Sequence, residues 1–235
     1  MKMRVVILCG GSGSRLWPES RESLPKQYIP IFESKSLLDL TIERVLKLLH
    51  KNKPIFICNK KHAFLVKNSL QKYNLEGDIL LEPKGKNTCP AIYLAAKQCE
   101  KKENILIMPS DHLITDTKKF IEKILEIEKL LKEDQWITLG INPVKPSDAY
   151  GYISVSKKTT NKLLKVDGFI EKPSKKIAQK LINKGNVYWN GGIFIAKKST
   201  IINSIKKHAP EISESCENVF NKITSSKNEF NYCPD

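Results

Sequence analysis

Short apolar runs alternate with segments of helical periodicity along most of this chain, and this alternation restricts the fold more than any other feature. The apolar runs lie at 4–10, 54–58, 78–82, 104–111 and 136–141. Uninterrupted apolar runs of this kind are typical of strands buried on both faces of a sheet. Strands that alternate with helices predict parallel pairs joined by helical crossovers. The sequence therefore predicts an α/β fold with a mostly parallel central sheet and helices on both faces.

Amphipathic segments between these runs predict where the helices lie. Ser36 is the predicted N-cap of the first helix, with Asp39 three residues later as in a capping box. Pro90 is predicted at the first position of a later helix, where its missing N–H costs no hydrogen bond. Leu125 and Ile177 fall on the apolar faces of two further predicted helices. These segments supply crossovers that a parallel sheet needs.

The ends of the strands predict where a ligand would bind. In open α/β sheets, ligands lie outside the carboxyl ends of the strands. The loops that follow Leu8, Leu81 and Met108 are therefore expected at one edge of the sheet. These three loops contain most of the candidate ligand-binding polar residues in the first half of the chain.

Length and composition narrow the class of protein. At 235 residues the chain suits one domain of ordinary size. No apolar run approaches the ~18 residues of a membrane span, and the start is too poor in apolar residues for a secretory signal. We therefore expect a cytoplasmic protein without a membrane partner. Six cysteines without a CxxC pair and four histidines without HExxH spacing favour reduced thiols over a zinc site.

The formal net charge is +15, from 40 Lys+Arg against 25 Asp+Glu. A positive field of this size suits either nucleic acid or a small polyanionic substrate. The lysines are spread thinly and show no aromatic and basic pattern of the RNA-binding type. We expect most of them to lie on solvated faces, and we expect no nucleic-acid partner.

The first apolar run leads into a loop rich in glycine and serine. This loop matches neither a Walker A loop nor a Rossmann fingerprint, because Leu16 stands where the fingerprint needs glycine. Glycines after a strand still let backbone N–H groups approach an anion closely. Arg15 is able to fork onto phosphate oxygens, and Lys26 adds a mobile point charge. A plain turn is the alternative, but the two cations favour a phosphate-binding loop.

Two further loops carry polar residues at the same predicted edge. Asp111, at the end of an apolar run, is either an N-cap or a magnesium ligand. Because it is predicted at the same edge of the sheet as the phosphate-binding loop, the role of magnesium ligand is favoured. Asn87 and Thr88 precede a helix and suit either a nucleotide base or a helix cap, without preference. Both loops therefore remain candidates for nucleotide contacts.

Glu171, Lys172 and Asn190 stand at the ends of later apolar strands. Carboxylate and amide oxygens there suit sugar hydroxyls, and a lysine suits a phosphate, although each residue alone is more often a surface residue. No Ser-His-Asp or Cys-His set is indicated by spacing. A reaction in which one substrate supplies the nucleophile fits this set of residues better than covalent catalysis.

The order of these motifs resembles one family, the sugar nucleotidyltransferases, and within it the mannose-1-phosphate guanylyltransferase branch. The similar segments run through essentially the whole chain; they are "GGSGSRLWPESRESLPKQY", "EPKGKNTCPAIYLAA", "IMPSDHLI", "LGINPVKPSDAYGYI", "GFIEKP" and "YWNGGIFIAKKS". The pattern GGxGxRLxP with a later PKQ marks the family, and Trp17 with "PSDH" points to the guanylyl and mannose branch. The resemblance implies a Rossmann-like nucleotidyltransferase fold.

The resemblance also implies roles for individual residues. The implied nucleotide-binding residues are Leu8, Gly10, Gly11, Ser12, Gly13, Glu82, Pro83, Gly85, Asn87, Thr88 and Ser110. The implied catalytic residues are Arg15, Lys26 and Asp111, and Asp111 would also hold the Mg²⁺ cofactor. The implied sugar-phosphate-binding residues are Gly151, Glu171, Lys172 and Asn190.

The reaction implied by the resemblance is Mg²⁺-assisted transfer of GMP from GTP to mannose 1-phosphate, giving GDP-mannose and pyrophosphate. The partners are then GTP and mannose 1-phosphate, and a homodimer is left open. Members of the family continue beyond "CPD" with a second metal-binding aspartate, so we expect a nucleotidyltransferase domain over 1–235 that lacks its C-terminal part. The alternatives are an inactive binder of GTP or a sugar nucleotide, and a sister enzyme using another NTP or sugar 1-phosphate.

Overall fold

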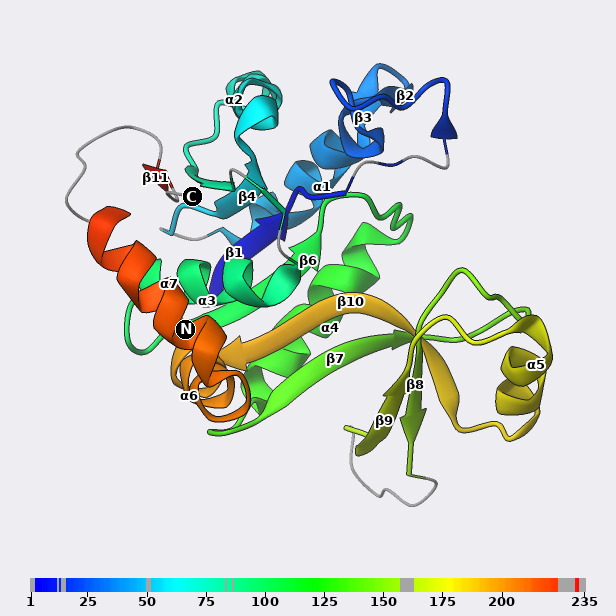
Figure 1. Cartoon of the computed structure of the whole chain (residues 1–235). Coiled ribbons are helices and arrows are strands. Elements are labelled where there is room, and N and C mark those ends of the chain that lie inside the picture. The colour runs from blue at the N-terminus through cyan, green and yellow to red at the C-terminus, as the bar shows by residue number, and fades with distance from the viewer. Residues whose placement is uncertain are drawn as a thin grey trace. The chain divides into compact units, whose positions relative to one another are not determined.

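The computed structural model describes residues 3–11, 13, 16–49, 52–82, 84–85, 87–156, 163–223 and 231–232 (Figure 1). Contacts within the chain separate two compact units. The first unit comprises Met1–Ile137 and Phe194–Asp235, and the second comprises Thr138–Ile193. The expectation of a single domain over 1–235 stays a prediction.

The first unit is built on a mostly parallel sheet, as the apolar runs predict. Its strands, in spatial order, are β11 (Asn231–Tyr232), β5 (Asp78–Glu82), β4 (Ile55–Asn59), β1 (Met3–Leu8), β6 (Asn104–Pro109) and the last part of β10 (Val187–Lys197). All neighbours in this order are parallel except β10, which runs antiparallel to β6. The parallel pairing of β1, β4, β5 and β6 confirms the predicted fold class.

Helices cover both faces of this sheet (Figure 1). They are α1 (Leu37–Val45), α2 (Ala63–Lys72), α3 (Thr88–Gln98), α4 (Thr117–Leu130), α6 (Lys198–His208) and α7 (Pro210–Ile223). One face packs against α3, α6 and α7, in a core that includes Val6, Ile107 and Ile201. The side chains of Val5 and Ile7 alternate to the other face, where α1, α2 and α4 lie, and both are fully buried.

Most local predictions for these helices are confirmed, and two are wrong. Ser36 and Asp39 form the predicted capping box at the start of α1. Helix α3 begins at Thr88, so Pro90 is its third residue and not its first. Pro90 is still tolerated there, because the N–H groups of the first turn have no partner within the helix. Leu125 is 37% exposed, so it does not belong to the buried face of α4, to which Ile127 contributes instead.

Short elements complete the first unit. They are the 3-10 helices η2 (Lys26–Tyr28), η3 (Leu46–Leu48) and η4 (Lys60–His62), and the hairpin strands β2 (Pro30–Phe32) and β3 (Lys35–Ser36). The 3-10 helix η2 matters most for function, because it carries Lys26 immediately before the buried Gln27 and Tyr28.

The second unit contains antiparallel strands and one helix. Its elements are most of β7 (Trp136–Ile141), β8 (Tyr152–Val155), β9 (Val166–Ile170), α5 (Lys175–Asn183) and the first part of β10. Strand β8 pairs with β9 on one side and with β10 on the other. Ser174 caps α5 and Ala178 is buried beneath it, but Ile177 is 49% exposed, so the prediction that Ile177 points inward is wrong.

Across the described ranges, no helix has both the length and the apolar character needed to cross a membrane.

Candidate active site

The carboxyl ends of β1 and β6 bring two of the predicted loops together. Leu8, the last residue of β1, lies opposite Pro109 of β6 and Ile57 of β4. The backbone N–H of Ser110 donates to the Leu8 carbonyl at 3.0 Å, and the N–H of Cys9 donates to the Ile57 carbonyl at 2.8 Å. Glu82 ends the parallel strand β5 opposite Asn59, two strands away from β1. The prediction that the three loops leave one edge of the sheet is therefore confirmed.

The glycine loop after β1 has a conformation that only glycine adopts easily. Gly11 has φ +99° and Gly13 has φ +63°, in the left-handed region where a side chain is strained. A Cβ on Gly13 would also lie 2.5 Å from the Cβ of Lys26. Gly10 and Gly11 are exposed, and an added Cβ would meet no atom within 4 Å at either position. The loop therefore packs closely on Lys26 at one end and is open at the other.

Gln27 fixes this loop, and the sequence analysis missed it. Its side-chain amide donates to the carbonyl of Cys9 at 2.8 Å and to the carbonyls of Gly10 and Gly11 at 3.3 Å. Gln27 is 2% exposed, so its amide has no bulk water to compete for these bonds. Its place next to Lys26 in "PKQY" was the only signal in the sequence. Because this buried amide donates to three backbone carbonyls of the glycine loop, it holds the loop against η2, the element that carries Lys26.

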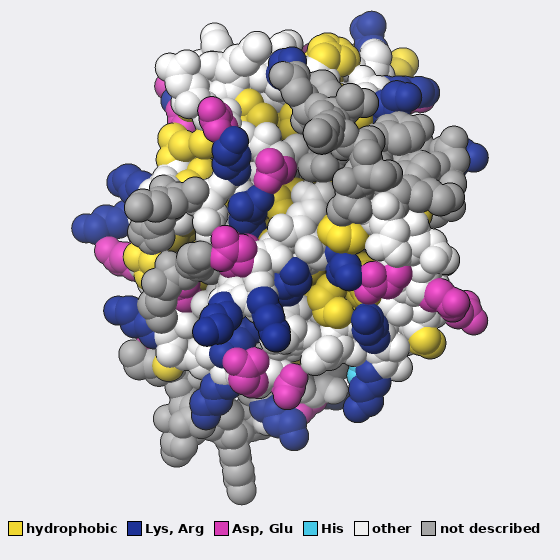
Figure 2. Space-filling model, turned by 90° about the vertical axis from the view of Figure 1, so that its left-hand side faces the viewer, with side chains coloured by type: hydrophobic (Ala, Val, Ile, Leu, Met, Phe, Trp, Pro, Cys, Tyr) yellow, Lys and Arg dark blue, Asp and Glu magenta, His cyan; other side chains and the backbone are white. Residues whose placement is uncertain are grey.

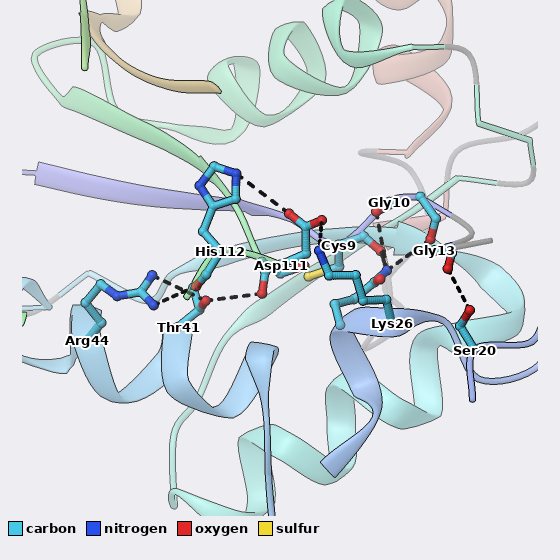
Figure 3. A network of polar contacts seen from close by, with 12 residues as sticks. Cys9, Gly10, Gly13, Ser20, Lys26, Thr41, Arg44, Asp111 and His112 are labelled. Carbon is cyan, nitrogen blue, oxygen red and sulfur yellow. Dashed lines mark hydrogen bonds and ion pairs between the residues drawn. The ribbon is translucent and has the colours of Figure 1, made fainter. Parts of the chain in front are cut away.

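Lys26 and Asp111 meet at the mouth of the glycine loop (Figure 3). The Lys26 Nζ lies 3.2 Å from Asp111 Oδ2, and the two side chains are 33% and 38% exposed. Lys26 comes from η2, and Asp111 comes from the loop after β6. Because both groups are partly exposed, they remain accessible to a ligand. The structure thus brings together two of the three residues predicted to be catalytic.

His112 lies on the far side of Asp111 from Lys26 (Figure 3). Its Nε2 is 3.9 Å from Asp111 Oδ1. Burial lowers the pKa of His112, and the neighbouring Asp111 carboxylate only partly opposes this effect. The imidazole is therefore neutral at neutral pH, and it does not neutralise Asp111.

The donors at this position fit a magnesium ion that arrives with a nucleotide. In the part of the chain that the structure describes, no three His, Cys, Asp or Glu side chains gather to hold a metal. Asp111 supplies a partly exposed carboxylate. Protein sites for Mg²⁺ with nucleotides commonly use one or two carboxylates together with substrate phosphates. One carboxylate beside a phosphate-binding loop is such a donor set.

The loop after β5 also has an unusual backbone. Asn87 is at the N-cap position of α3, but its side chain makes no capping hydrogen bond. Its φ of 66° and ψ of −175° lie in a region that is essentially restricted to glycine, so the backbone is strained there. Asn87, Thr88 and Gly85 are exposed. Of the two alternatives left open by the sequence, capping by the Asn87 side chain is thus the weaker. Burial raises the pKa of Glu82, at the end of β5.

The four residues implied for sugar-phosphate binding lie together in the second unit. A Cβ on Gly151 would be 2.9 Å from Glu171 Oε2 and 3.6 Å from the Cβ of Asn190. The N–H of Asn190 donates to the Gly151 carbonyl at 2.8 Å, and the Asn190 amide oxygen accepts from the Gly192 N–H at 3.0 Å. Lys172 Nζ is 2.9 Å from Glu171 Oε1. Gly151, Glu171, Lys172 and Asn190 are hereafter the second-unit cluster.

Three predicted site residues, Ser12, Arg15 and Pro83, lie outside the described residues.

Two buried thiols lie near the end of β1. Cys9 directly precedes Gly10, and Cys58 lies on the neighbouring strand β4. Burial raises the pKa of Cys9, and it raises the pKa of Cys58 to about 12. Both thiols therefore stay protonated at neutral pH and act in packing.

The surface charge on the face shown in Figure 2 is mixed. Lysine and arginine side chains are scattered over that face with acidic side chains among them. Such a distribution agrees with lysines that lie on solvated faces.

Comparisons with known proteins agree with these features. A family model described as "Nucleotidyl transferase" matches residues 4–231. The mannose-1-phosphate guanylyltransferase of Escherichia coli is 37% identical over an alignment of 244 positions, which covers 98% of this chain and 52% of the relative. The chain therefore spans about half the length of the curated relatives it matches.

Two solved structures are similar over most of the chain. The crystal structure titled mannose-1-phosphate geranyltransferase, from Thermus thermophilus, has a TM-score of 0.82 and 31% identity over 94% of this chain and 65% of that one. The crystal structure titled mannose-6-phosphate isomerase, from Helicobacter pylori, has a TM-score of 0.80 and 31% identity over 94% of this chain and 80% of that one. The names of all three relatives refer to a mannose phosphate.

Proposed function

Because the chain belongs to the nucleotidyl transferase family, we propose that it transfers GMP from GTP to mannose 1-phosphate and releases pyrophosphate. The observation that carries this proposal is the contact between Lys26 and Asp111 beside the glycine loop. This arrangement offers a backbone loop for phosphates, a cation for their charge and a carboxylate for a metal. The choice of GTP and mannose 1-phosphate follows the name of the Escherichia coli relative.

The reaction needs positioning and charge neutralisation more than proton removal. The phosphate of mannose 1-phosphate is already mostly ionised at pH 7, because the second pKa of a phosphate monoester is about 6. One of its oxygens attacks the α-phosphorus of GTP, and the bond to the departing pyrophosphate breaks. Two anions must therefore approach each other, so the protein supplies positive charge and orientation. In this proposal Lys26 supplies that charge at the phosphates, and the glycine loop orients them.

Asp111 is the residue that would hold Mg²⁺ in this site. A bound Mg²⁺ would stabilise negative charge on the phosphate oxygens of GTP. Lys26, 3.2 Å from the same carboxylate, keeps the free carboxylate paired and would turn to the phosphates once they arrive. Gln27 maintains the shape of the glycine loop that lies beside Lys26 and Asp111.

We assign the second-unit cluster to mannose 1-phosphate. The carboxylate of Glu171 and the amide of Asn190 are hydrogen-bonding groups for sugar hydroxyls, and Lys172 offers a charge for the phosphate. Lys172 has φ 39°, a backbone conformation that non-glycine residues adopt mainly where the surroundings hold them. Gly151 lies close to Glu171, because a Cβ there would be 2.9 Å from Glu171 Oε2 and the carboxylate would have to shift.

The decisive experiment measures pyrophosphate release from GTP and mannose 1-phosphate in the presence of Mg²⁺. The chain is compared with Asp111→Asn and with the matched control Asp116→Asn. Asp116 caps α4 through Lys119 N–H, and asparagine caps a helix about as well as aspartate. We expect turnover by the chain and the control, and a loss of at least about 100-fold in Asp111→Asn.

Three other results would change the conclusion. GTP binding without pyrophosphate release would indicate a binder and not a transferase. Faster turnover with another NTP or another sugar 1-phosphate would indicate a sister activity. Equal turnover by Asp111→Asn and the control would remove Asp111 from the mechanism and with it the proposed site.

A further inference from the structure

The loop that carries Asp111 is hydrogen-bonded to two side chains of helix α1. Thr41 Oγ1 donates to the carbonyl of Ser110 at 3.2 Å. Arg44 Nη2 donates to the carbonyl of His112 at 2.9 Å. The two peptide carbonyls on either side of Asp111 are therefore bound by side chains one helical turn apart on α1 (Figure 3).

Arg44 is an unusual residue in this position. It is 1% exposed, and within the described ranges no carboxylate pairs with it. Its Nη1 lies 3.5 Å from Thr41 Oγ1, and its guanidinium lies over the ring of Phe120 from α4 at 5.8 Å. Burial lowers the pKa of Arg44 to about 10, so it stays charged at neutral pH. Burying a charged group without a counter-ion is costly, and here the charge contacts neutral groups, among them the His112 carbonyl of the loop and the Thr41 hydroxyl of α1.

We propose that Thr41 and Arg44 are positioning residues that hold Asp111 in place for the metal and nucleotide. They bind the carbonyls of Ser110 and His112, the residues before and after Asp111, while the Ser110 N–H is bound to the end of β1. With its backbone bound on both sides, the Asp111 carboxylate is directed at Lys26 before any ligand binds. The inference rests on the role proposed above for Asp111.

Thr41→Val tests the first contact with little change in shape. Thr41 is fully buried, so valine keeps the volume but removes the donor to the Ser110 carbonyl and the acceptor for Arg44 Nη1. Thr41→Ser keeps the donor and serves as the rescuing variant. Thr200→Val is the matched control, because Thr200 is 1% exposed on α6 and its hydroxyl has no hydrogen-bond partner among the described residues.

The first readout does not depend on turnover. Amide hydrogen exchange is followed in the ligand-free protein over the segment 109–113. Mn²⁺ is then titrated in the presence of GTP, and free Mn²⁺ is measured by electron paramagnetic resonance. We expect faster exchange in this segment for Thr41→Val but not for Thr41→Ser or Thr200→Val, and a Kd for Mn²⁺ raised about tenfold in Thr41→Val, as when a residue that orients a metal ligand is removed.

The second readout is the steady-state rate of pyrophosphate release. Thr41→Val is expected to lower kcat about tenfold while the KM for GTP changes little, because the loop geometry and not the nucleotide pocket is altered. Thr41→Ser should restore most of kcat. Arg44→Lys, which keeps the charge but loses the planar fork, should behave like Thr41→Val.

Two results would overturn the inference. One is unchanged exchange in the segment 109–113 and unchanged Mn²⁺ affinity in Thr41→Val. The other is an equal loss in Thr200→Val, which would show a general effect of removing a buried hydroxyl. If the unmodified chain releases no pyrophosphate, the proposed function fails, but the exchange and Mn²⁺ measurements still decide whether α1 positions Asp111.

Discussion

Single residues of the site depend on contacts between distant parts of the chain. Lys26 and Asp111 are 85 positions apart, and their contact forms only because β1 and β6 are neighbours. The backbone of Gly13 also depends on a contact with another segment, because it packs directly against Lys26. The positive φ of Gly13 and its lack of a side chain are both needed for that approach.

Gly13→Ala is expected to destabilise the fold by about 2 kcal/mol, because alanine is strained at φ +63° and its Cβ would collide with Lys26. Urea unfolding measures this change. Gly168→Ala is the control, since its Cβ would meet only Ser154 Oγ at an ordinary 3.6 Å. A Gly13→Ala protein as stable as this control would show that the loop relaxes without cost.

Asn87→Gly separates a role in binding from a role in stability. Glycine relieves the strained backbone and removes a side chain that caps nothing, so the free energy of unfolding should stay the same or rise by up to about 1 kcal/mol. If the amide contacts the nucleotide, the KM for GTP should rise several-fold in the same variant. An unchanged KM would remove Asn87 from the nucleotide-binding set.

Pairs of elements are held by small groups of charges. Glu217 on α7 accepts from Lys97 of α3 at 2.8 Å and from the Tyr93 hydroxyl at 2.7 Å. The hydrogen bond from Lys97 and then that from Tyr93 lower the pKa of Glu217 from 4.5 to about 2. The same carboxylate raises the pKa of Tyr93, whose burial is the larger cause. These contacts join α3 and α7 on the same face of the sheet.

The lowered pKa of Glu217 predicts how stability depends on pH. Its contribution is fully present above pH 4.5 and is lost as the pH falls toward 2, because the unfolded chain takes up the proton first. Glu217→Gln should therefore cost about 1 kcal/mol at pH 6, a value reduced by solvent at this partly exposed pair, and progressively less below pH 4.5. Chemical unfolding at several pH values measures it, with the exposed Glu214→Gln on the same helix as control. A cost that does not shrink at low pH would contradict the assignment.

At the scale of the whole molecule, the net charge of +15 favours anionic ligands in general. Specific binding of GTP must therefore be distinguished from attraction to any polyanion. Thermal unfolding makes this distinction without relying on turnover, because a ligand that binds only the folded chain raises the melting temperature.

GTP with Mg²⁺ at about 100 times its Kd should add about 2.7 kcal/mol of stability. For a chain of this size that corresponds to a rise in Tm of about 5 to 10 °C. ATP at the same concentration should have a smaller effect, and a duplex oligonucleotide at about 0.15 M salt should have almost none. A larger shift with the oligonucleotide would favour the nucleic-acid alternative over a nucleotide site.

The architecture of the first unit and the place of its candidate site were predictable from the amino-acid sequence. Apolar periodicity predicted the parallel strands, and the ends of those strands predicted the edge where the glycine loop and Asp111 meet. The capping box of Ser36 and Asp39 was likewise predictable, because it depends on residues only three positions apart. The start of α3 was misjudged by two residues, since propensity alone does not separate the first positions of a helix.

The side chains that support the candidate site became visible in the folded chain and were not predictable from local patterns. Gln27, Thr41 and Arg44 have no motif of their own, and each acts on backbone carbonyls. The exposure of Leu125 and Ile177 was equally beyond local periodicity, because it depends on where each helix lies on the sheet. A pattern in the chain states which residues lie on one face of an element. The groups that this face contacts depend on how elements distant in the sequence pack together. They depend on packing because every buried polar group needs a hydrogen-bond partner, and that partner often comes from another element.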